Sequence, residues 1–281
     1  MKRFEMCPEY FGPFWKFVSD DSIVDVDWNG RQLWLRNMYG RKWRENLEIT
    51  DLFLRQFCQR VANLEEASFN ANCPELEADT ERLRITCVLE DAASTGTCVF
   101  IRKSQPKVRL TEEGMIRDGY CSKQIHDLIV NCIRADMSVI VCGSPGVGKT
   151  ELEKYLSRSI NPNARAVVIE DNNEWHYEKI NPEKDCVSIK VDEVFSYTDA
   201  IKASLRMNTD WLIVAEVRSV ETTALIEAAS TGLHTITSLH TGDVRDIPDR
   251  ILSMMGNPEA ADRLENDIYR DIDVGILVRW K

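Results

Sequence analysis

Residues 141–150, VCGSPGVGKT, have the types and spacing that bind phosphate, because two glycines bracket four residues and are followed by lysine and threonine. The glycines let the backbone turn sharply and bring its N–H groups up to phosphate oxygens, and the proline stiffens the turn. The lysine places a positive charge between the terminal phosphates, and the threonine hydroxyl can ligate the magnesium that bridges them. The predicted phosphate-binding residues are Gly143, Ser144, Pro145, Gly146, Val147, Gly148, Lys149 and Thr150.

The sequence on either side of this loop predicts the elements that must position it. The run SVIVC at 138–142 is apolar and rich in β-branched residues, which indicates a buried strand. After the loop, apolar residues recur at helical spacing over 150–160, which indicates a helix. The N-terminus of such a helix completes an anion site. A strand, a loop and a helix in this order predict nucleotide binding and leave the reaction open.

Acidic residues follow two further apolar runs, and hydrolysis of a nucleotide needs such acids for magnesium and for the attacking water. VVIED ends in Glu170 and Asp171, with Glu174 close behind, and WLIVAE ends in Glu216. The common Walker B strand carries aspartate where Ala215 stands, so the magnesium acid must come from elsewhere. We expect Glu174 near the metal and Glu216 near the water. For Glu170 and Asp171 the alternative stays open that they only occupy a turn.

A histidine follows a third apolar run. His240 comes directly after the strand-like run HTITSL at 234–239, so it is expected at the same end of the sheet as Glu216. A single histidine is more often structural, but at a strand end beside acids it could sense the terminal phosphate. His234 lies at the start of that strand and is a weaker candidate.

Composition excludes several classes of function. The net charge of −11, from 35 basic and 46 acidic residues, argues against a dedicated nucleic-acid surface. Nine cysteines without a C-x-x-C pair predict no structural zinc and a reducing compartment. No apolar run approaches the roughly 20 residues of a membrane span, and no signal peptide is recognisable. We therefore expect a cytoplasmic protein that reaches a membrane only through partners.

The order of the predicted elements indicates two domains. Alternating residues around Asn29-Gly30 predict a hairpin, a helix is expected over 51–64 behind Thr50 or Asp51, and two strands over 83–89 and 97–103 complete a small α+β domain at 1–103. A polar linker at 104–111 follows. Strands and helices then alternate through 112–281, which predicts a P-loop, RecA-like parallel sheet with helices on both faces. Its expected elements are helices at 121–134, 150–160 and 219–230 and strands at 138–142, 165–170, 211–215 and 234–239.

Together these motifs resemble the secretion-superfamily ATPases, which power type II secretion, type IV secretion and type IV or Flp (Tad) pili. GSPGVGKT resembles the family's Walker A motif, VVIEDNNEW its Asp box, SLRMNTDWLIVAEVR its Walker B region and TGLHTITSLHTGD its His box. The absence of the Walker B aspartate is itself a feature of that family. The segments ERLRITCVLEDAASTGTCVFIRKS and IVDVDWNGRQLWLRNMYGRK resemble its N-terminal domain. The strings SLRM, IRK and VR favour the CpaF-like Flp/Tad and type IV secretion branch.

The resemblance implies roles for individual residues. Glu174 would help to order metal and water, Glu216 would act on the attacking water, and His240 would be the His-box histidine. Two arginines of the N-terminal domain, Arg84 and Arg102, would reach the terminal phosphate. Arg206 and Arg218 match further motif positions, and Arg206 is expected among the nucleotide-binding residues together with Glu170. The resemblance also implies ATP and Mg²⁺ as cofactors, a homo-hexameric ring, and an inner-membrane platform or secretion-channel protein as partner.

Departures from the family pattern keep a second function open. Thr209 replaces a proline and Ala215 replaces a glycine. Leu233 follows Thr231-Gly232 where TGH is expected from the family. A nucleotide-binding regulator or scaffold that has lost hydrolysis would explain these changes. A small-molecule kinase would need an acceptor pocket and an arginine-rich lid, and no such lid is recognisable. Because the chain ends at VRWK, the C-terminal helices of the family are expected to be shortened.

Overall fold

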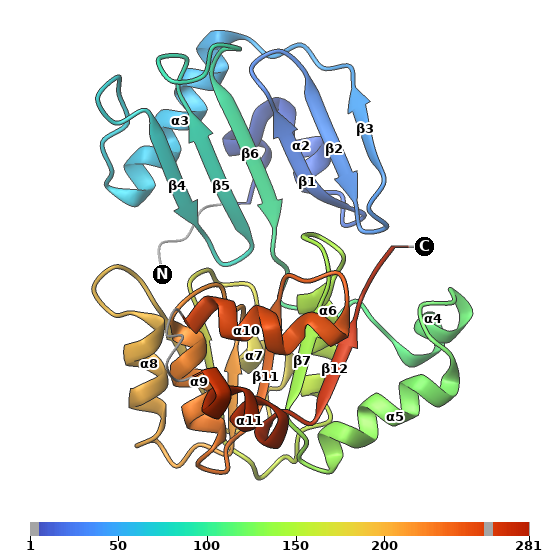
Figure 1. Ribbon diagram of the computed structural model, residues 1–281. Helices are drawn as coiled ribbons and strands as arrows, with labels where there is room; N and C mark the ends of the chain where they lie inside the picture. Colours follow the sequence, from blue (N-terminus) through green and yellow to red (C-terminus); the bar gives the residue numbers. More distant parts are fainter. Residues whose placement is uncertain (1–5, 256–260, 281) are drawn as a thin grey trace. The chain divides into compact units, whose positions relative to one another are not determined.

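The computed structural model describes residues 6–255 and 261–280, and the chain forms two compact units, Met1–Gln105 and Pro106–Lys281 (Figure 1). Each unit contains its own sheet. Within the described ranges no helix combines the length and the apolar character needed to cross a bilayer.

The N-terminal unit is built on a six-stranded antiparallel sheet with the order β3-β2-β1-β6-β5-β4. The predicted hairpin is confirmed, since β1 pairs with β2 around Asn29-Gly30. The side chain of Asn29 closes the turn by accepting the N–H groups of Arg31 and Gln32 at 3.1 and 2.9 Å. The strands are β1 (Ile23–Trp28), β2 (Leu33–Asn37), β3 (Lys42–Glu45), β4 (Glu75–Asp79), β5 (Leu83–Val88) and β6 (Cys98–Lys103).

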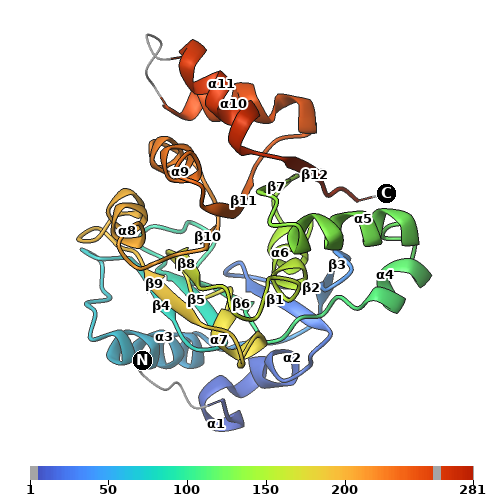
Figure 2. The same ribbon diagram turned by 90° about the horizontal axis from the view of Figure 1, so that it is seen from below.

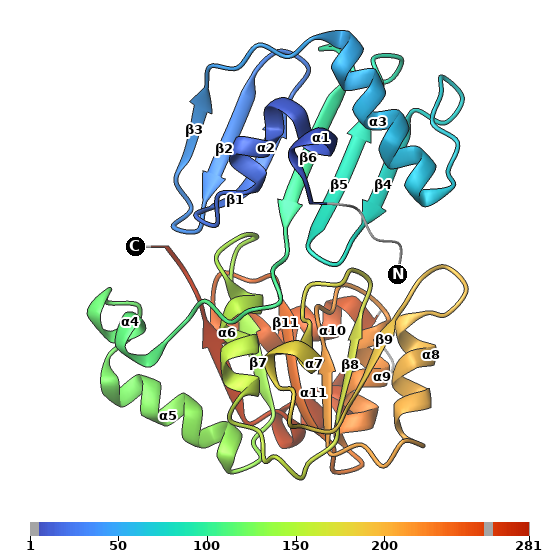
Figure 3. The same ribbon diagram turned by 180° about the vertical axis from the view of Figure 1, so that it is seen from behind.

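Helices cover one face of this sheet, as Figure 3 shows from behind. They are α1 (Pro8–Phe11), α2 (Trp15–Val18) and α3 (Asp51–Glu65), with a 3-10 turn at Gly12–Phe14. The predicted helix α3 is confirmed, and its cap is Thr50, whose Oγ1 accepts the N–H of Phe53 at 3.2 Å. Its buried face carries Leu54, Phe57 and Val61, and Phe57 packs on the ring of Phe14. The opposite face of the sheet carries charged side chains.

The C-terminal unit is built on six parallel strands in the order β12-β7-β11-β10-β8-β9. All four predicted strands of this unit are present, and the others are β9 and β12. The strands are β7 (Val139–Cys142), β8 (Ala166–Glu170), β9 (Cys186–Lys190), β10 (Trp211–Val214), β11 (His234–Leu239) and β12 (Val274–Leu277).

Both faces of the parallel sheet are covered by helices (Figures 1 and 2). Along β7, Val139 and Val141 pack into one core with α5 and α6, whereas Ile140 and Cys142 pack into the other with α8, α9, α10 and α11. This alternation buries both faces and confirms the predicted α/β fold. The helices are α4 (Glu112–Arg117), α5 (Lys123–Arg134), α6 (Lys149–Ser157), α7 (Tyr177–Ile180), α8 (Tyr197–Ser204), α9 (Glu221–Ala229), α10 (Ile247–Met255) and α11 (Ala261–Asp271).

Candidate nucleotide-binding and catalytic site

The predicted phosphate loop joins β7 to α6, which is the setting that its motif requires. Gly143 and Gly148 both have positive φ, at 150° and 96°. A Cβ atom on Gly143 would also overlap the carbonyl oxygen of Val278, so only glycine fits there. Helix α6 begins at Lys149 directly behind the loop, so its first N–H groups have no partner within the helix and remain available to an anion.

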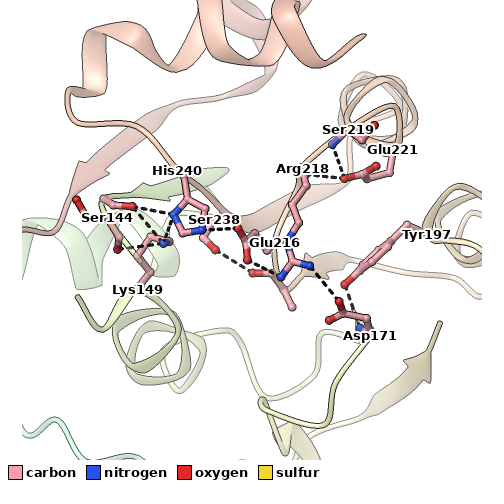
Figure 4. Close-up of polar contacts among 12 residues, drawn as sticks. Ser144, Lys149, Asp171, Tyr197, Glu216, Arg218, Ser219, Glu221, Ser238 and His240 are labelled. Carbon is pink, nitrogen blue, oxygen red and sulfur yellow. Dashed lines mark hydrogen bonds and ion pairs between the residues drawn. The ribbon is translucent and has the colours of Figure 1, made fainter. Parts of the chain in front are cut away.

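Lys149 is buried within the loop and has three polar neighbours (Figure 4). Its Nζ lies 3.2 Å from the carbonyl oxygen of Gly143, 3.5 Å from that of Ser144 and 2.9 Å from Nδ1 of His240. Burial lowers the pKa of Lys149, and the carboxylates of Glu216 and Glu153 oppose that shift. An ammonium has three N–H donors, so a phosphate that binds Lys149 must replace at least one of these partners.

His240 connects the loop to the predicted catalytic acid. It follows the last residue of β11, and its Nε2 lies 2.7 Å from Oε1 of Glu216, a close contact that is not aligned as a hydrogen bond. Nδ1 of His240 lies 2.9 Å from Nζ of Lys149 and 3.1 Å from the carbonyl oxygen of Gly143, so the tautomer of the imidazole determines whether Nδ1 accepts from the first or donates to the second. The structure brings together the three residues that the sequence placed at one end of the sheet.

Glu216 is held from its other side by an arginine. Its Oε2 accepts from Arg218 at 2.8 Å, and the same guanidinium lies 3.2 Å from Asp171 (Figure 4). The hydrogen bond to Glu216 raises the pKa of Arg218 above its ordinary value. The backbone N–H of Asp171 in turn donates to the hydroxyl of Tyr197, the first residue of α8, at 3.0 Å. Both carboxylate oxygens of Glu216 therefore have a cationic or imidazole neighbour.

Neighbouring strands fix the backbone on both sides of Glu216. The N–H of Ala215 donates to Ile169 at 3.0 Å, which continues the pairing of β10 with β8. The Ser238 hydroxyl donates to the carbonyl oxygen of Ala215 at 2.9 Å, and the N–H of Val217 donates to the carbonyl oxygen of Ser238 at 3.0 Å. The ends of three parallel strands thus hold the segment that carries the acid.

Glu170 shapes the turn that carries Glu174. Its Oε2 accepts the N–H groups of Glu174 and Trp175 at 2.8 and 3.0 Å, and the side chain is buried. Burial raises the pKa of Glu170 to about 7, although the two backbone N–H groups act in the opposite direction. One carboxylate oxygen of Glu170 therefore holds the turn that follows β8. The side chain of Glu174 on this turn is half-buried.

Arg84 and Arg102 lie next to each other in the N-terminal unit, as paired residues of β5 and β6 on the charged face of the sheet. Buried Asp25 on β1 lies 2.9 Å from Arg102 and 3.5 Å from Arg36 on β2. At the other end Arg84 lies 3.7 Å from Asp79 on β4. Charged residues therefore form a row across five strands. Asp25 and Arg36 were not predicted, because their pairing depends on strand register.

Arg206 and Thr209 lie in the segment between α8 and β10. Arg206 is exposed and follows α8 on the side where β10 begins, so within this unit it lies at the opposite edge of the sheet from Lys149. Thr209, where the family has proline, donates its hydroxyl to the carbonyl oxygen of Ser204 at 2.6 Å and so closes the end of α8. Tyr197 and Glu153 carried no signal in the sequence, since their relation to the site arises only on folding.

The chain is similar to known proteins in sequence and in fold. Residues 77–270 match the family described as type II/IV secretion system protein. An uncharacterized protein of Bacillus anthracis is 27% identical over 92% of this chain and 59% of its own length. The chain spans about half the length of the curated relatives it matches, with shares of 59, 43 and 38% for three of them.

Solved structures share the fold. The ATPase DotB of Legionella pneumophila is similar with a TM-score of 0.69 at 19% identity, over 99% of this chain and 77% of that chain. The pilus retraction motor PilT, solved with bound ADP, is similar with a TM-score of 0.65 at 17% identity, over 93% of this chain and 75% of that chain. At these identities the likeness concerns the fold alone.

Proposed function

Because the chain belongs to the type II/IV secretion system protein family, we propose that it is an ATP-hydrolysing motor subunit of a bacterial secretion or pilus-assembly system. The observation that carries the proposal is the continuous contact from Lys149 through His240 to Glu216. It joins the phosphate loop to the acid that follows β10, so nucleotide and catalytic base would meet at one edge of the sheet.

In this proposal Lys149 and the loop N–H groups bind the phosphates of ATP. Glu216 accepts a proton from the attacking water, and His240 links the occupancy of Lys149 to the position of Glu216. Arg218 and Asp171 orient the carboxylate of Glu216. Arg84 and Arg102 of the N-terminal unit have the proposed role of binding the terminal phosphate.

Magnesium fits the oxygen donors at this edge. Thr150 is the second residue of α6, and Glu174 follows the carboxyl end of β8 on the turn shaped by Glu170. Hydroxyl and carboxylate oxygens are the ligands that Mg²⁺ prefers. We propose that Thr150 and Glu174 hold the ion, which would neutralise charge on the terminal phosphates.

We further propose that the protein works as a homo-hexameric ring at the cytoplasmic face of the inner membrane, bound through a platform or channel protein. The function then divides between an N-terminal domain (1–103), a linker (104–111) and an ATPase domain (112–281). The motif strings SLRM and IRK support the Flp/Tad or type IV secretion branch, and the ring follows from the resemblance of the motifs.

A second function, a nucleotide-binding regulator without hydrolysis, is favoured by one observation. Both carboxylate oxygens of Glu216 are in contact with other side chains, Oε1 with His240 and Oε2 with Arg218. A base that stays held in this way could bind ATP without activating water. The substitution at Ala215 lies in the Walker B-like region with Glu216, and the substitution at Leu233 lies in the His-box-like segment with His240.

Phosphate release from ATP, measured at several protein concentrations beside a Glu216→Gln variant, separates these functions. A motor that assembles gives a specific activity that rises with protein concentration and is lost in the variant. Activity that is independent of dilution would contradict the ring. ATP binding without phosphate release at any concentration would replace the motor by the regulator.

A further inference from the structure

A buried glutamate lies directly behind the phosphate loop and has no role in the site described above. Glu153 on α6 has no exposed surface, and neither carboxylate oxygen has a hydrogen-bond partner among the described residues. A buried carboxyl without donors lowers the stability of a fold, because it loses its hydration and gains nothing in return. Packing alone therefore gives no reason for an acid here, since the neighbouring Leu152 and Leu156 are apolar.

The place of Glu153 on its helix relates it to Lys149. The two residues are four apart on α6, so they lie on the same face of the helix, one turn from each other. Charged groups from three parts of the unit act on the Glu153 carboxyl: Lys149 and Lys154 from α6, Glu216 after β10 and Glu174 after β8. Lys149 is the strongest of these charges.

We propose that Glu153 is a positioning residue of the phosphate site, which acts through Lys149 by setting the net charge that this buried pair presents to a phosphate. The proposal rests on the proposed function, because it requires a nucleotide at Lys149.

The physical argument concerns the charge of the pair. With Glu153 neutral, the ammonium of Lys149 is the dominant charge facing a phosphate. With Glu153 ionised, its carboxylate repels the phosphate and offsets that ammonium across a poorly screened interior. Burial raises the pKa of Glu153 well above its ordinary value, while Lys149 lowers it, so a rise in pH would convert the first state into the second.

ADP binding at constant Mg²⁺, measured by calorimetry between pH 6 and 8, tests the proposal on the full chain and on Glu153→Gln. The glutamine has the shape of the neutral acid and cannot ionise. We expect the ratio of the parent Kd to the variant Kd to increase with pH, to about tenfold weaker binding by the parent once Glu153 is ionised.

Glu151→Gln is the matched control. Glu151 is on the same helix, but its carboxylate lies 3.6 Å from Lys154 and is not among the strongest charges that act on Lys149. Its Kd ratio to the parent should not change with pH. A Glu153→Gln ratio that is also flat across the series would overturn the proposal.

A second measurement separates positioning from packing. Without nucleotide, Tm of Glu153→Gln should rise relative to the parent as pH increases, because the parent must then bury a charge. If Tm changes in this way but the Kd ratio stays constant, Glu153 has only a structural effect and the inference fails. If ADP binds neither protein at any pH, the proposed function itself is wrong and the inference fails with it.

Discussion

Nε2 of His240 lies 2.7 Å from Oε1 of Glu216, although 24 residues separate them in the chain. They come into contact because β10 and β11 are parallel neighbours, so the residues after both strands emerge at the same edge of the sheet. The other nitrogen of this imidazole lies 2.9 Å from Lys149. One side chain therefore touches both the lysine of the phosphate-loop motif and the proposed base.

Glu216→Gln should abolish ATP hydrolysis while ATP binding is retained. The amide keeps the shape of the side chain and its contact with Arg218 but cannot accept a proton from water. We expect phosphate release to fall by about 10²- to 10⁴-fold. Glu227→Gln, an exposed acid on α9, is the matched control and should retain full activity. A Glu216→Gln protein that still hydrolyses ATP at the parent rate would remove Glu216 from the mechanism.

Arg218→Gln should lower kcat and leave KM nearly unchanged. The guanidinium bridges Glu216 and Asp171 at 2.8 and 3.2 Å, so its loss releases the orientation of the base rather than the nucleotide. The expected loss is roughly ten- to a hundredfold, from a charge-assisted hydrogen bond worth about 1.5–3 kcal/mol. Tyr197→Phe removes only the acceptor for the Asp171 N–H and should have a smaller effect of the same kind. A rise in KM at constant kcat would instead assign Arg218 to substrate binding.

Glu170→Gln should stabilise the protein at neutral pH and not in acid. Burial raises the pKa of Glu170 from 4.5 to about 7, so the folded protein binds a proton more tightly than the unfolded chain does. The stability of the parent therefore falls as pH rises from 4.5 to 7, by a total on the order of 3 kcal/mol. Glutamine can still accept the N–H groups of Glu174 and Trp175 but does not titrate. Urea unfolding at pH 4.5 and pH 8 measures this, and an equal difference from the parent at both pH values would contradict it.

Two aspartates on β1 should respond to substitution in opposite directions. Asp25 is buried and pairs with Arg102 and Arg36, so Asp25→Asn should cost about 1–2 kcal/mol. Burial and the charge of Asp25 raise the pKa of Asp27, so its ionised form is unfavourable in the folded protein. Asp27→Asn should therefore raise Tm at pH 7. Thermal unfolding of both variants of the full chain measures these changes. A loss of stability in both would contradict the explanation that burial and the charge of Asp25 make ionised Asp27 unfavourable.

Local sequence was sufficient wherever the physical cause is local. In the phosphate loop, Gly143 and Gly148 adopt the positive φ that glycine tolerates. Thr50 caps α3 through its own side chain, and Asn29-Gly30 forms the turn of a hairpin. The apolar runs at 138–142 and 211–215 became buried parallel strands because such strands are covered on both faces. In each of these cases a few consecutive residues contain the whole cause.

Segments with weak apolar periodicity were missed, because no few consecutive residues in them contain the cause of strand formation. The strand β9 (Cys186–Lys190) lies at an edge of the sheet and is only partly buried, so it lacks the apolar run that marked β7 and β10. β3 (Lys42–Glu45) is likewise an edge strand, within a basic stretch. Their pairing depends on a neighbouring strand and not on their own composition.

The sequence by itself determined the phosphate loop, the two sheets and the expectation that Glu216 and His240 meet at one edge. The tertiary structure decided which atoms meet: that one imidazole spans Lys149 and Glu216, and that Arg218 holds the second oxygen of Glu216. It also decided that Glu153 is buried with no hydrogen-bond partner for its carboxylate among the residues that the structure describes. These relations depend on strand order, register and burial, which arise from contacts between residues far apart in the chain, and no local pattern encodes them.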